Sequence, residues 1–359
     1  MERRREGPNA DVLAPGETKR SVPTRFVLLG VAVLLLAVGL LFGEPVAAPA
    51  GSPELGVSPI VRRSIQEARS APRQQVLAPG LEAPRARGTI VEDSFFSEIL
   101  AREMPYAIYL PPGYETSGQR YPVLYALHGL AGYYAEWVDF GAVDVADSLF
   151  SNAKVPSFIM VFPQGDQSYW FNHPQGGDAW ADYLTEEVVP LIDSRYRTIP
   201  RRAGRAIGGL SMGATGALQI ALRRPDLFSV VGAHSPSFRT TPDADVFWFF
   251  SDPIYYRQYD PFVLVRTTRA AERLRIWLDV GDADPWRDRT EQFDALLTSR
   301  GIPHRFTIGQ GEHEGTYWGA RMADYLTFYG YALISPAGGP ETLDPASVPP
   351  TRVPTRPPS

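Results

Sequence analysis

The chain has 359 residues and no cysteine. This absence excludes disulfide bonds, thiolate metal sites and a cysteine nucleophile together. It does not fix the compartment, because a large core can stabilise an exported protein without disulfides. Histidine is scarce as well, with five in the chain, so few side chains could serve as a catalytic base. The central part of the chain has no basic run and the net charge is -5, so we expect no nucleic-acid partner.

One long apolar run, residues 26–42, is preceded by basic residues. Its length is at the lower limit for a membrane-spanning helix and slightly above that of a usual signal-peptide core. The charge asymmetry orients the N-terminus inward and the rest of the chain outward. The polar residues 1–25 favour a cytoplasmic tail before an uncleaved anchor, whereas Ala48-Pro49-Ala50 resembles the cleavage site of a secreted protein. A buried core helix is the third interpretation. In the first two cases the body of the protein is exported, either held at the cell membrane or secreted.

Alternating segments between residues 88 and 335 predict the folded domain. Residues 43–87, rich in Pro, Ala, Gly and Arg, are interpreted as a linker with one short helix around 61–70, and the Pro-rich residues 336–359 as a disordered tail. Strands are expected at 88–100, 105–110, 123–127, 157–162, 205–208, 230–234, 274–280 and 305–308, and helices at 136–150, 180–196, 212–223, 286–300 and 317–331. This alternation predicts an α/β domain with a mostly parallel central sheet and helices on both faces. Ligands of such sheets bind outside the carboxyl ends of the strands.

The segment Gly209-Leu210-Ser211-Met212-Gly213 has the form of a nucleophile elbow. In that motif a strand ends, the chain turns sharply and a helix begins at the serine, whose hydroxyl is exposed at the tip. Small glycines on either side allow the crowded turn to close. The pentapeptide alone is a weak signal. The apolar strand before it and the Ala- and Leu-rich helix after it strengthen the interpretation.

A serine nucleophile needs a base and an acid that orients the base. His313 lies in a polar loop after the last expected strand, which fits the order serine, acid, histidine. Asp284, at the tip of the loop after the penultimate strand, is the preferred acid. If Asp284 instead caps the helix that starts near Trp286, Asp282 would be the acid. Asp279, within the strand pattern, is expected to serve the structure.

The oxyanion hole is expected to use two backbone N–H groups. One is that of Met212, directly after the nucleophile. The other is that of Leu130, in the glycine-rich loop His128–Gly132, with His128 bracing the loop. His304 is expected to pack or cap, and His234 to line the pocket at most.

Two aromatic segments, 168–173 and 246–250, are expected near the mouth of the site. Their functional interpretation is an apolar acyl or aryl pocket, or a surface on which a sugar stacks. Their structural interpretation is that they cover the core. Trp170, His173 and Trp248 are the candidate substrate contacts.

Several motifs together carry a family resemblance. They are Tyr109-Leu110-Pro111-Pro112-Gly113-Tyr114, the segment from Tyr121 to Gly129, Trp180-Ala181-Asp182-Tyr183, the segment from Arg205 to Ala214, and Gly311-Glu312-His313-Glu314 with Trp318. The pattern covers most of residues 88–335 and resembles the putative-esterase family of α/β-hydrolases. That family includes feruloyl and acetyl-xylan esterases, enterochelin esterases, S-formylglutathione hydrolases and mycolyltransferases. The family often has two glycines before its histidine, and here Glu312 replaces one of them.

The resemblance implies an α/β-hydrolase fold and a catalytic triad of Ser211, Asp284 and His313. It implies a serine carboxylesterase that acts on a small-molecule, carbohydrate or lipid ester and requires no metal or other cofactor. An exported location argues against S-formylglutathione hydrolase, whose substrate is cytosolic. The alternatives are an acyltransferase like the mycolyltransferases, a non-catalytic surface-binding module and a serine peptidase. The oligomeric state stays open.

Overall fold

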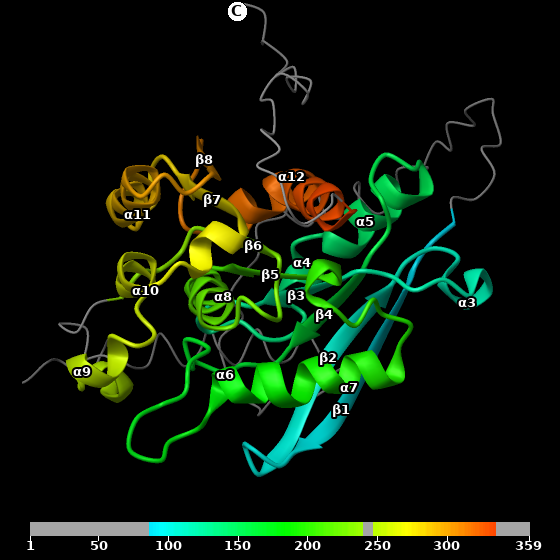
Figure 1. Ribbon diagram of the computed structural model, residues 1–359. Helices are drawn as coiled ribbons and strands as arrows, with labels where there is room; N and C mark the ends of the chain where they lie inside the picture. Colours follow the sequence, from blue (N-terminus) through cyan, green and yellow to red (C-terminus); the bar gives the residue numbers. More distant parts are fainter. Residues whose placement is uncertain (1–85, 240–246, 335–359) are drawn as a thin grey trace, which may run out of the picture. The chain divides into compact units, whose positions relative to one another are not determined.

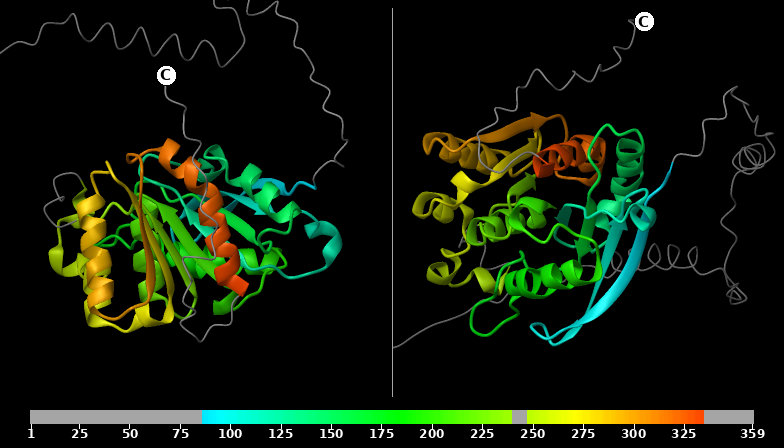
Figure 2. Two further views of the ribbon diagram at one scale, coloured as in Figure 1. Left: turned by 90° about the horizontal axis from the view of Figure 1, so that it is seen from above. Right: turned by 45° about the vertical axis from the view of Figure 1, so that its right-hand side comes forward.

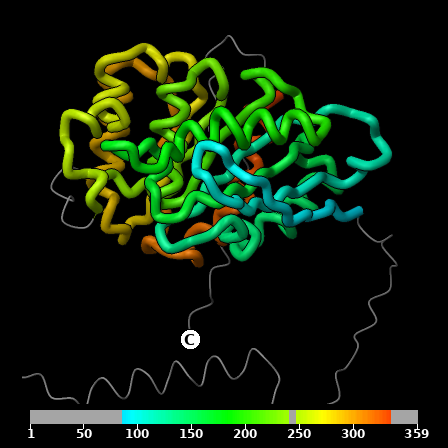
Figure 3. The backbone as a smooth tube through the Cα atoms, turned by 90° about the horizontal axis from the view of Figure 1, so that it is seen from below, coloured from blue at the N-terminus to red at the C-terminus, as the bar shows by residue number. Residues whose placement is uncertain are grey.

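The computed structural model describes residues 86–239 and 247–334 (Figures 1 and 3). The expected tail at 1–25, the apolar run at 26–42, almost all of the linker at 43–87 and the C-terminal tail at 336–359 lie outside the described residues. Within the part that is described, no helix has both the length and the apolar character needed to cross a bilayer.

Eight strands form one sheet. They are β1 (Thr89–Ser97), β2 (Arg102–Leu110), β3 (Val123–Leu127), β4 (Ile159–Pro163), β5 (Arg205–Leu210), β6 (Val230–His234), β7 (Arg275–Gly281) and β8 (His304–Gly309). Their order in the sheet is β1-β2-β4-β3-β5-β6-β7-β8. The hairpin β1–β2 is antiparallel, as is β2 with β4, and the pairs from β4 through β3 to β8 are parallel. The expected α/β-hydrolase architecture is therefore confirmed, with the hairpin at one edge (Figure 2).

Helices cover both faces of this sheet (Figures 1 and 2). They are α3 (Tyr114–Ser117), α4 (Glu136–Asp139), α5 (Ala142–Ser151), α6 (Trp180–Asp182), the π-helical η1 (Tyr183–Val188), α7 (Val189–Arg195), η2 (Arg202–Gly204), α8 (Met212–Arg223), η4 (Trp248–Phe250), α9 (Pro253–Tyr256), α10 (Pro261–Thr267), η5 (Ala270–Arg273), α11 (Arg287–Ser299) and α12 (Gly315–Ile334). Side chains of α7, α8, α10 and α11 share one core, and those of α4, α5 and α12 share the other.

Strand β3 shows why two cores form. Val123, Tyr125 and Leu127 belong to the first core, and Leu124 and Ala126 to the second. Successive side chains of a strand point to opposite faces, so a continuous apolar run fills a layer on each side.

Two of the expected helices differ from those observed. The helix expected at 136–150 is divided into α4 and α5, because Gly141 adopts φ 89°, which ends one helix before the next begins. The helix expected at 180–196 contains the π-helical turn η1. The short α3, α9 and α10 were not expected. Helices α9 and α10 each begin at the proline of an Asp-Pro pair, whose aspartate accepts hydrogen bonds from backbone N–H groups of the first turn.

Candidate active site

The turn between β5 and α8 presents Ser211. The serine has φ 55° and ψ -114°, a strained conformation for a residue with a side chain. A Cβ at Gly209 would lie 2.6 Å from the nitrogen of Ala214, and one at Gly213 would lie 2.6 Å from the carbonyl oxygen of His128. Both glycines are thus required by close approach: the first closes the turn, and the second lets the loop after β3 lie against the start of α8.

The structure brings Ser211, His313 and Asp284 together. Ser211 Oγ lies 2.7 Å from Nε2 of His313, and Nδ1 of the same ring lies 2.8 Å from Oδ2 of Asp284. An ionised carboxylate only accepts hydrogen bonds, so Nδ1 carries the ring proton and Nε2 can accept from the serine. The indole of Trp318 packs edge-on against the imidazole at 5.2 Å between ring centres and restricts its orientation.

Asp284 serves two partners, one with each carboxylate oxygen. Oδ2 faces His313, and Oδ1 accepts the N–H of Trp286 at 2.8 Å, just before α11. The expectation that Asp284 either caps the helix or orients the histidine, but not both, is wrong, because a carboxylate has acceptor sites on both oxygens.

Asp282 binds main-chain groups at the start of the loop that carries His313. Its Oδ1 accepts the N–H of Gly311 at 2.9 Å, and its own N–H donates to the carbonyl oxygen of Gly309 at 2.7 Å. Asp282 therefore joins the loop after β7 to the loop that carries His313.

Asp279 is fully buried and accepts three hydrogen bonds, as expected of a structural residue. The donors are Nδ1 of His234 at 2.5 Å and the hydroxyls of Tyr317 and Tyr325, both at 2.9 Å. Burial raises the pKa of Tyr325 well above its ordinary value, so this phenol remains a donor. His234 is also fully buried, so the expectation that it lines the pocket is wrong.

The two N–H groups expected to form the oxyanion hole, one in the loop after β3 and one at the start of α8, are unpaired within the part of the chain that is described. The turn of the loop after β3 is closed by a hydrogen bond from the N–H of Gly132 to the oxygen of Gly129 at 3.1 Å, with Ala131 at φ 61°. In residues 86–239 and 247–334, no protein group accepts a hydrogen bond from the N–H of Leu130 or that of Met212. Unpaired N–H groups beside a nucleophile are the chemistry that an oxyanion hole requires.

His128 braces this loop, as expected. Its Nε2 accepts the N–H of Gly165 at 2.9 Å, so Nδ1 carries the proton and donates to the oxygen of Gly129 at 2.8 Å. Burial lowers the pKa of His128 to about 4, which keeps the ring neutral at pH 7.

The expected substrate contact at Trp170 needs correction. Its side chain is fully buried. A Cβ at Gly165 would lie 2.6 Å from its Cε2 and closer still to the rest of the ring, and one at Gly216 would lie 2.5 Å from its Cβ. Its indole N–H points to the carbonyl oxygen of His128 at 3.4 Å. Trp170 therefore packs beneath the oxyanion loop, out of reach of a substrate.

His173 and Trp248 lie together at the surface. His173 stacks on Phe249 with ring centres 4.2 Å apart and meets Trp248 edge-on at 5.6 Å. Trp248 is 52% exposed. Among the described residues, no hydrogen bond or ring contact joins either side chain to Ser211, Asp284 or His313, so their role in substrate binding stays a prediction.

Two further features of the site were missed by the sequence analysis. Ser237 donates its N–H to the carbonyl oxygen of Ser211 at 3.2 Å, and the hydroxyl of Tyr169 lies 3.4 Å from Oγ of Ser237. Glu136 accepts the N–H of Gly129 at 2.6 Å. The only signal for Glu136 was an acidic residue four positions after a glycine-rich loop.

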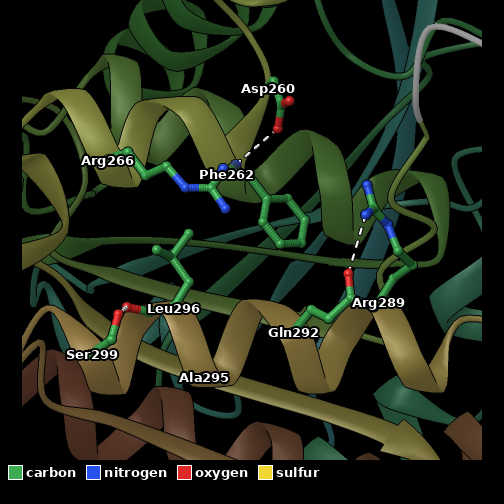
Figure 4. A pocket seen from close by; sticks show the side chains of 8 residues that line it. All are labelled: Asp260, Phe262, Arg266, Arg289, Gln292, Ala295, Leu296 and Ser299. Carbon is green, nitrogen blue, oxygen red and sulfur yellow. Dashed lines mark hydrogen bonds between the residues drawn. The ribbon is translucent and has the colours of Figure 1, made fainter.

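The described residues contain a hollow that is separate from the Ser211 site. It has a volume of about 470 Å³ and lies between α10 and α11 (Figure 4). Its lining includes Phe262, Arg266 and Arg289 and no residue named above as a candidate for catalysis. Within the same described ranges, no group of three or more His, Asp or Glu side chains could hold a metal ion.

The fold and the geometry at Ser211 define a protein of the serine-hydrolase type on an α/β-hydrolase scaffold. The family model described as "Putative esterase" matches residues 97–329. The chain belongs to this family.

Named relatives give the comparison more detail. The chain is 31% identical over 153 residues to an endo-1,4-beta-xylanase/feruloyl esterase of Xylanibacter ruminicola, covering 40% of this chain and 21% of that protein. It is 30% identical over 256 residues to the diacylglycerol acyltransferase/mycolyltransferase Ag85A of Mycobacterium leprae, covering 59% and 75%. Among solved structures, a ferulic acid esterase is similar with a TM-score of 0.63 and 27% identity, covering 68% of this chain and 99% of that one. The chain thus spans about a fifth of the first relative and three quarters of the second.

Proposed function

We propose that this protein is an exported serine carboxylesterase that hydrolyses acyl esters through an acyl-enzyme. The observation that carries the proposal is the pair of hydrogen bonds that runs from Ser211 through His313 to Asp284. The relatives named as esterases support the same reaction class.

In the acylation step, Ser211 Oγ attacks the ester carbonyl carbon while Nε2 of His313 takes the serine proton. The carbonyl π electrons move to the oxygen, and the N–H groups of Leu130 and Met212 stabilise the resulting oxyanion. Asp284 favours the imidazolium that forms. The bond from carbon to the leaving oxygen then breaks, and His313 returns the proton to the departing alcohol.

In the deacylation step, water replaces the alcohol. His313 removes a proton from the water as it attacks the acyl carbon. The bond between the acyl carbon and Ser211 Oγ then breaks, the acid leaves, and His313 returns the proton to Oγ. The side chain of His313 is 21% exposed, which supports access of an acceptor to Nε2.

A second candidate is acyl transfer, in which a sugar or lipid hydroxyl replaces water. The extended similarity to the mycolyltransferase favours it specifically. The same acyl-enzyme serves both reactions, so the acceptor distinguishes them. An added alcohol that diverts product from acid to ester indicates transfer.

We also place the catalytic domain outside the cytoplasm, either anchored by residues 26–42 or secreted after cleavage. The support is the apolar run with basic residues before it. Fractionation of cells that produce the full chain, followed by protease treatment of intact cells, tests this. Degradation of the domain from outside supports export, and full protection contradicts it.

Initial rates of hydrolysis of p-nitrophenyl acetate, longer p-nitrophenyl esters and methyl ferulate by the full chain test the proposed activity. Methyl ferulate is included because similar proteins are named as feruloyl or ferulic acid esterases. Ser211→Ala is the matched control. Activity that disappears in this variant supports the esterase. Equal rates in both proteins, with no labelling of the wild type by a fluorophosphonate, favour a surface-binding module.

A further inference from the structure

Glu136 lies beside the oxyanion loop, at the start of α4. Its Oε2 accepts the N–H of Gly129 at 2.6 Å, a short distance of the kind found when the acceptor is ionised. No other hydrogen bond reaches this carboxylate from the described residues, and none of their Lys or Arg side chains pairs with it. A partly buried carboxylate with a single backbone donor costs desolvation energy, so its placement calls for an explanation.

At Gly132 the carboxylate leaves no room for a side chain, whereas at Gly129 a Cβ would make ordinary van der Waals contacts. A Cβ at Gly132 would lie 2.7 Å from the carboxyl carbon of Glu136. A Cβ at Gly129 would lie 3.5 Å from Oε2 of Glu136 and 3.4 Å from Cβ of Ser211. The Gly129 residue thus stands between the carboxylate on one side and the nucleophile on the other.

Two consecutive N–H groups of the loop differ in that only the first is paired within the described residues. The N–H of Gly129 is held by Glu136, while that of Leu130 has no acceptor among the described residues. Holding the first N–H orients the peptide between His128 and Gly129. The next peptide, which carries the Leu130 N–H, is held at its oxygen by Nδ1 of His128 and the N–H of Gly132, so the contacts on both peptides together set the direction of the Leu130 N–H. Glycine restricts its own backbone poorly, so an outside contact is needed to hold this geometry.

The charge of Glu136 also bears on the base. Burial raises the pKa of Glu136, whereas the hydrogen bond from the Gly129 N–H and, more weakly, the His313 ring lower it. The attraction is strongest when His313 is protonated, which is the state after it has taken the proton of Ser211. An ionised Glu136 would oppose a nearby oxyanion, so the benefit of the residue has to come from the position that it gives to the loop.

We propose that Glu136 is a positioning residue for the oxyanion hole: it holds the Gly129 N–H so that the Leu130 N–H faces the ester oxygen. The proposal rests on the esterase activity proposed above, and it adds a requirement at a residue that does not touch the substrate.

Two conservative variants of the full chain separate the hydrogen bond from the charge. Glu136→Gln keeps an oxygen that can accept the Gly129 N–H and removes the charge. Glu136→Asp keeps the charge but withdraws it by one methylene. Asp139→Asn is the control, since this carboxylate on the same short helix binds the Tyr133 hydroxyl at 2.7 Å and does not contact the loop backbone. Melting temperatures of all variants report folding.

The readouts are kcat and KM for a p-nitrophenyl ester and the inhibition constant of a trifluoromethyl ketone. Ser211 Oγ adds to the carbonyl carbon of this ketone, the serine proton passes to His313, and the ketone oxygen becomes an oxyanion in the hole. Losing a whole oxyanion donor costs about 100- to 1000-fold in kcat, so a displaced donor should cost about tenfold or more. We expect this loss in kcat, and a matching loss of ketone affinity, in Glu136→Asp, with KM changed less than about threefold. Glu136→Gln and Asp139→Asn should stay within about threefold of the wild type.

Three results overturn the proposal. In the first, Glu136→Asp is as active as the wild type and binds the ketone as tightly. In the second, Glu136→Gln is impaired and Glu136→Asp is not, which makes the charge the operative property. In the third, the wild type neither hydrolyses esters nor binds the ketone, in which case the proposed function fails and the role of Glu136 fails with it.

Discussion

Replacing Asp284 by asparagine tests how His313 is held in one tautomer. Asp284 accepts from two groups, the Nδ1–H of His313 at 2.8 Å and the N–H of Trp286 at 2.8 Å. An asparagine has one oxygen, and the backbone N–H of Trp286 always needs an acceptor. The amide oxygen therefore turns to Trp286, and the amide NH₂ faces His313. The ring must then give up the proton on Nδ1 and carry it on Nε2.

With its proton on Nε2, His313 can no longer accept from Ser211 Oγ at 2.7 Å. The expected loss in kcat is about 10⁴-fold, the scale seen when the orienting acid of a serine triad is neutralised. At 1.36 kcal/mol for each factor of ten, this corresponds to about 5.4 kcal/mol of barrier. The assay is the steady-state hydrolysis of a p-nitrophenyl ester at pH 7 to 9, with the melting temperature measured in parallel.

Asp282→Asn is the matched comparison for Asp284→Asn. Its side-chain oxygen can still accept the N–H of Gly311, so kcat should change by less than about threefold. If Asp284→Asn retained a tenth or more of the wild-type kcat while Asp282→Asn lost most of its activity, the assignment of the acid would be reversed.

Other predictions concern packing and pH. Gly213→Ala should abolish folding or activity, because its Cβ would overlap main-chain oxygens. Gly319→Ala in α12 should keep or slightly raise the melting temperature, because its Cβ would lie 3.4 Å from the nearest atom, the oxygen of Phe140. Thermal denaturation of both variants checks this. The pKa of His128 is about 4 in the folded protein and about 6.5 in the unfolded chain, so the unfolded chain binds more protons between these pH values. The free energy of unfolding therefore falls as the pH drops through this window. In urea titrations, the wild type should lose about 1–2 kcal/mol more than His128→Gln between pH 7 and pH 5. Replacing the buried Trp170 by alanine should cost about 3–5 kcal/mol of stability. Trp248→Ala should change stability by less than about 1 kcal/mol and, if Trp248 contacts the substrate, raise KM. A lower melting temperature for Trp248→Ala than for Trp170→Ala would contradict the burial argument.

Much of the site was predictable because its elements are set by short-range rules. The glycines around Ser211 identify a turn that only small residues permit, and apolar strands fix which end of the sheet carries the loops. Parallel pairing then aligns the strand ends: Leu210 pairs with His234, and Gly281 with Gly309. Because the strands were assigned correctly and pair in parallel, the loops after β5, β7 and β8 were expected at the same end of the sheet.

The conformation of the loop after β4 could not be predicted in the same way. Asp166, Tyr169, Trp170 and Gln175 all have positive φ in the structure, which local preference alone would not select. Trp170 turns inward because Gly216 in α8 leaves space for its indole. That space depends on a helix far along the sequence, so an aromatic segment near the expected mouth gave no indication of which ring would be buried.

Carboxylates that bind backbone N–H groups connect the loops of the site to one another. Asp282 holds Gly311, Asp284 holds Trp286 and Glu136 holds Gly129. Each interaction fixes a backbone segment next to a proposed catalytic group at the strand ends, where loops would otherwise sample many conformations.

In the proposed mechanism, the reaction moves one proton back and forth through His313 and builds negative charge at a single oxygen. Groups already in place for that charge need no rearrangement during the step, and this is the main way in which a site of fixed dipoles lowers a barrier. The backbone-binding carboxylates should therefore affect kcat more than KM, because they set the geometry of the transition state and touch no part of the substrate.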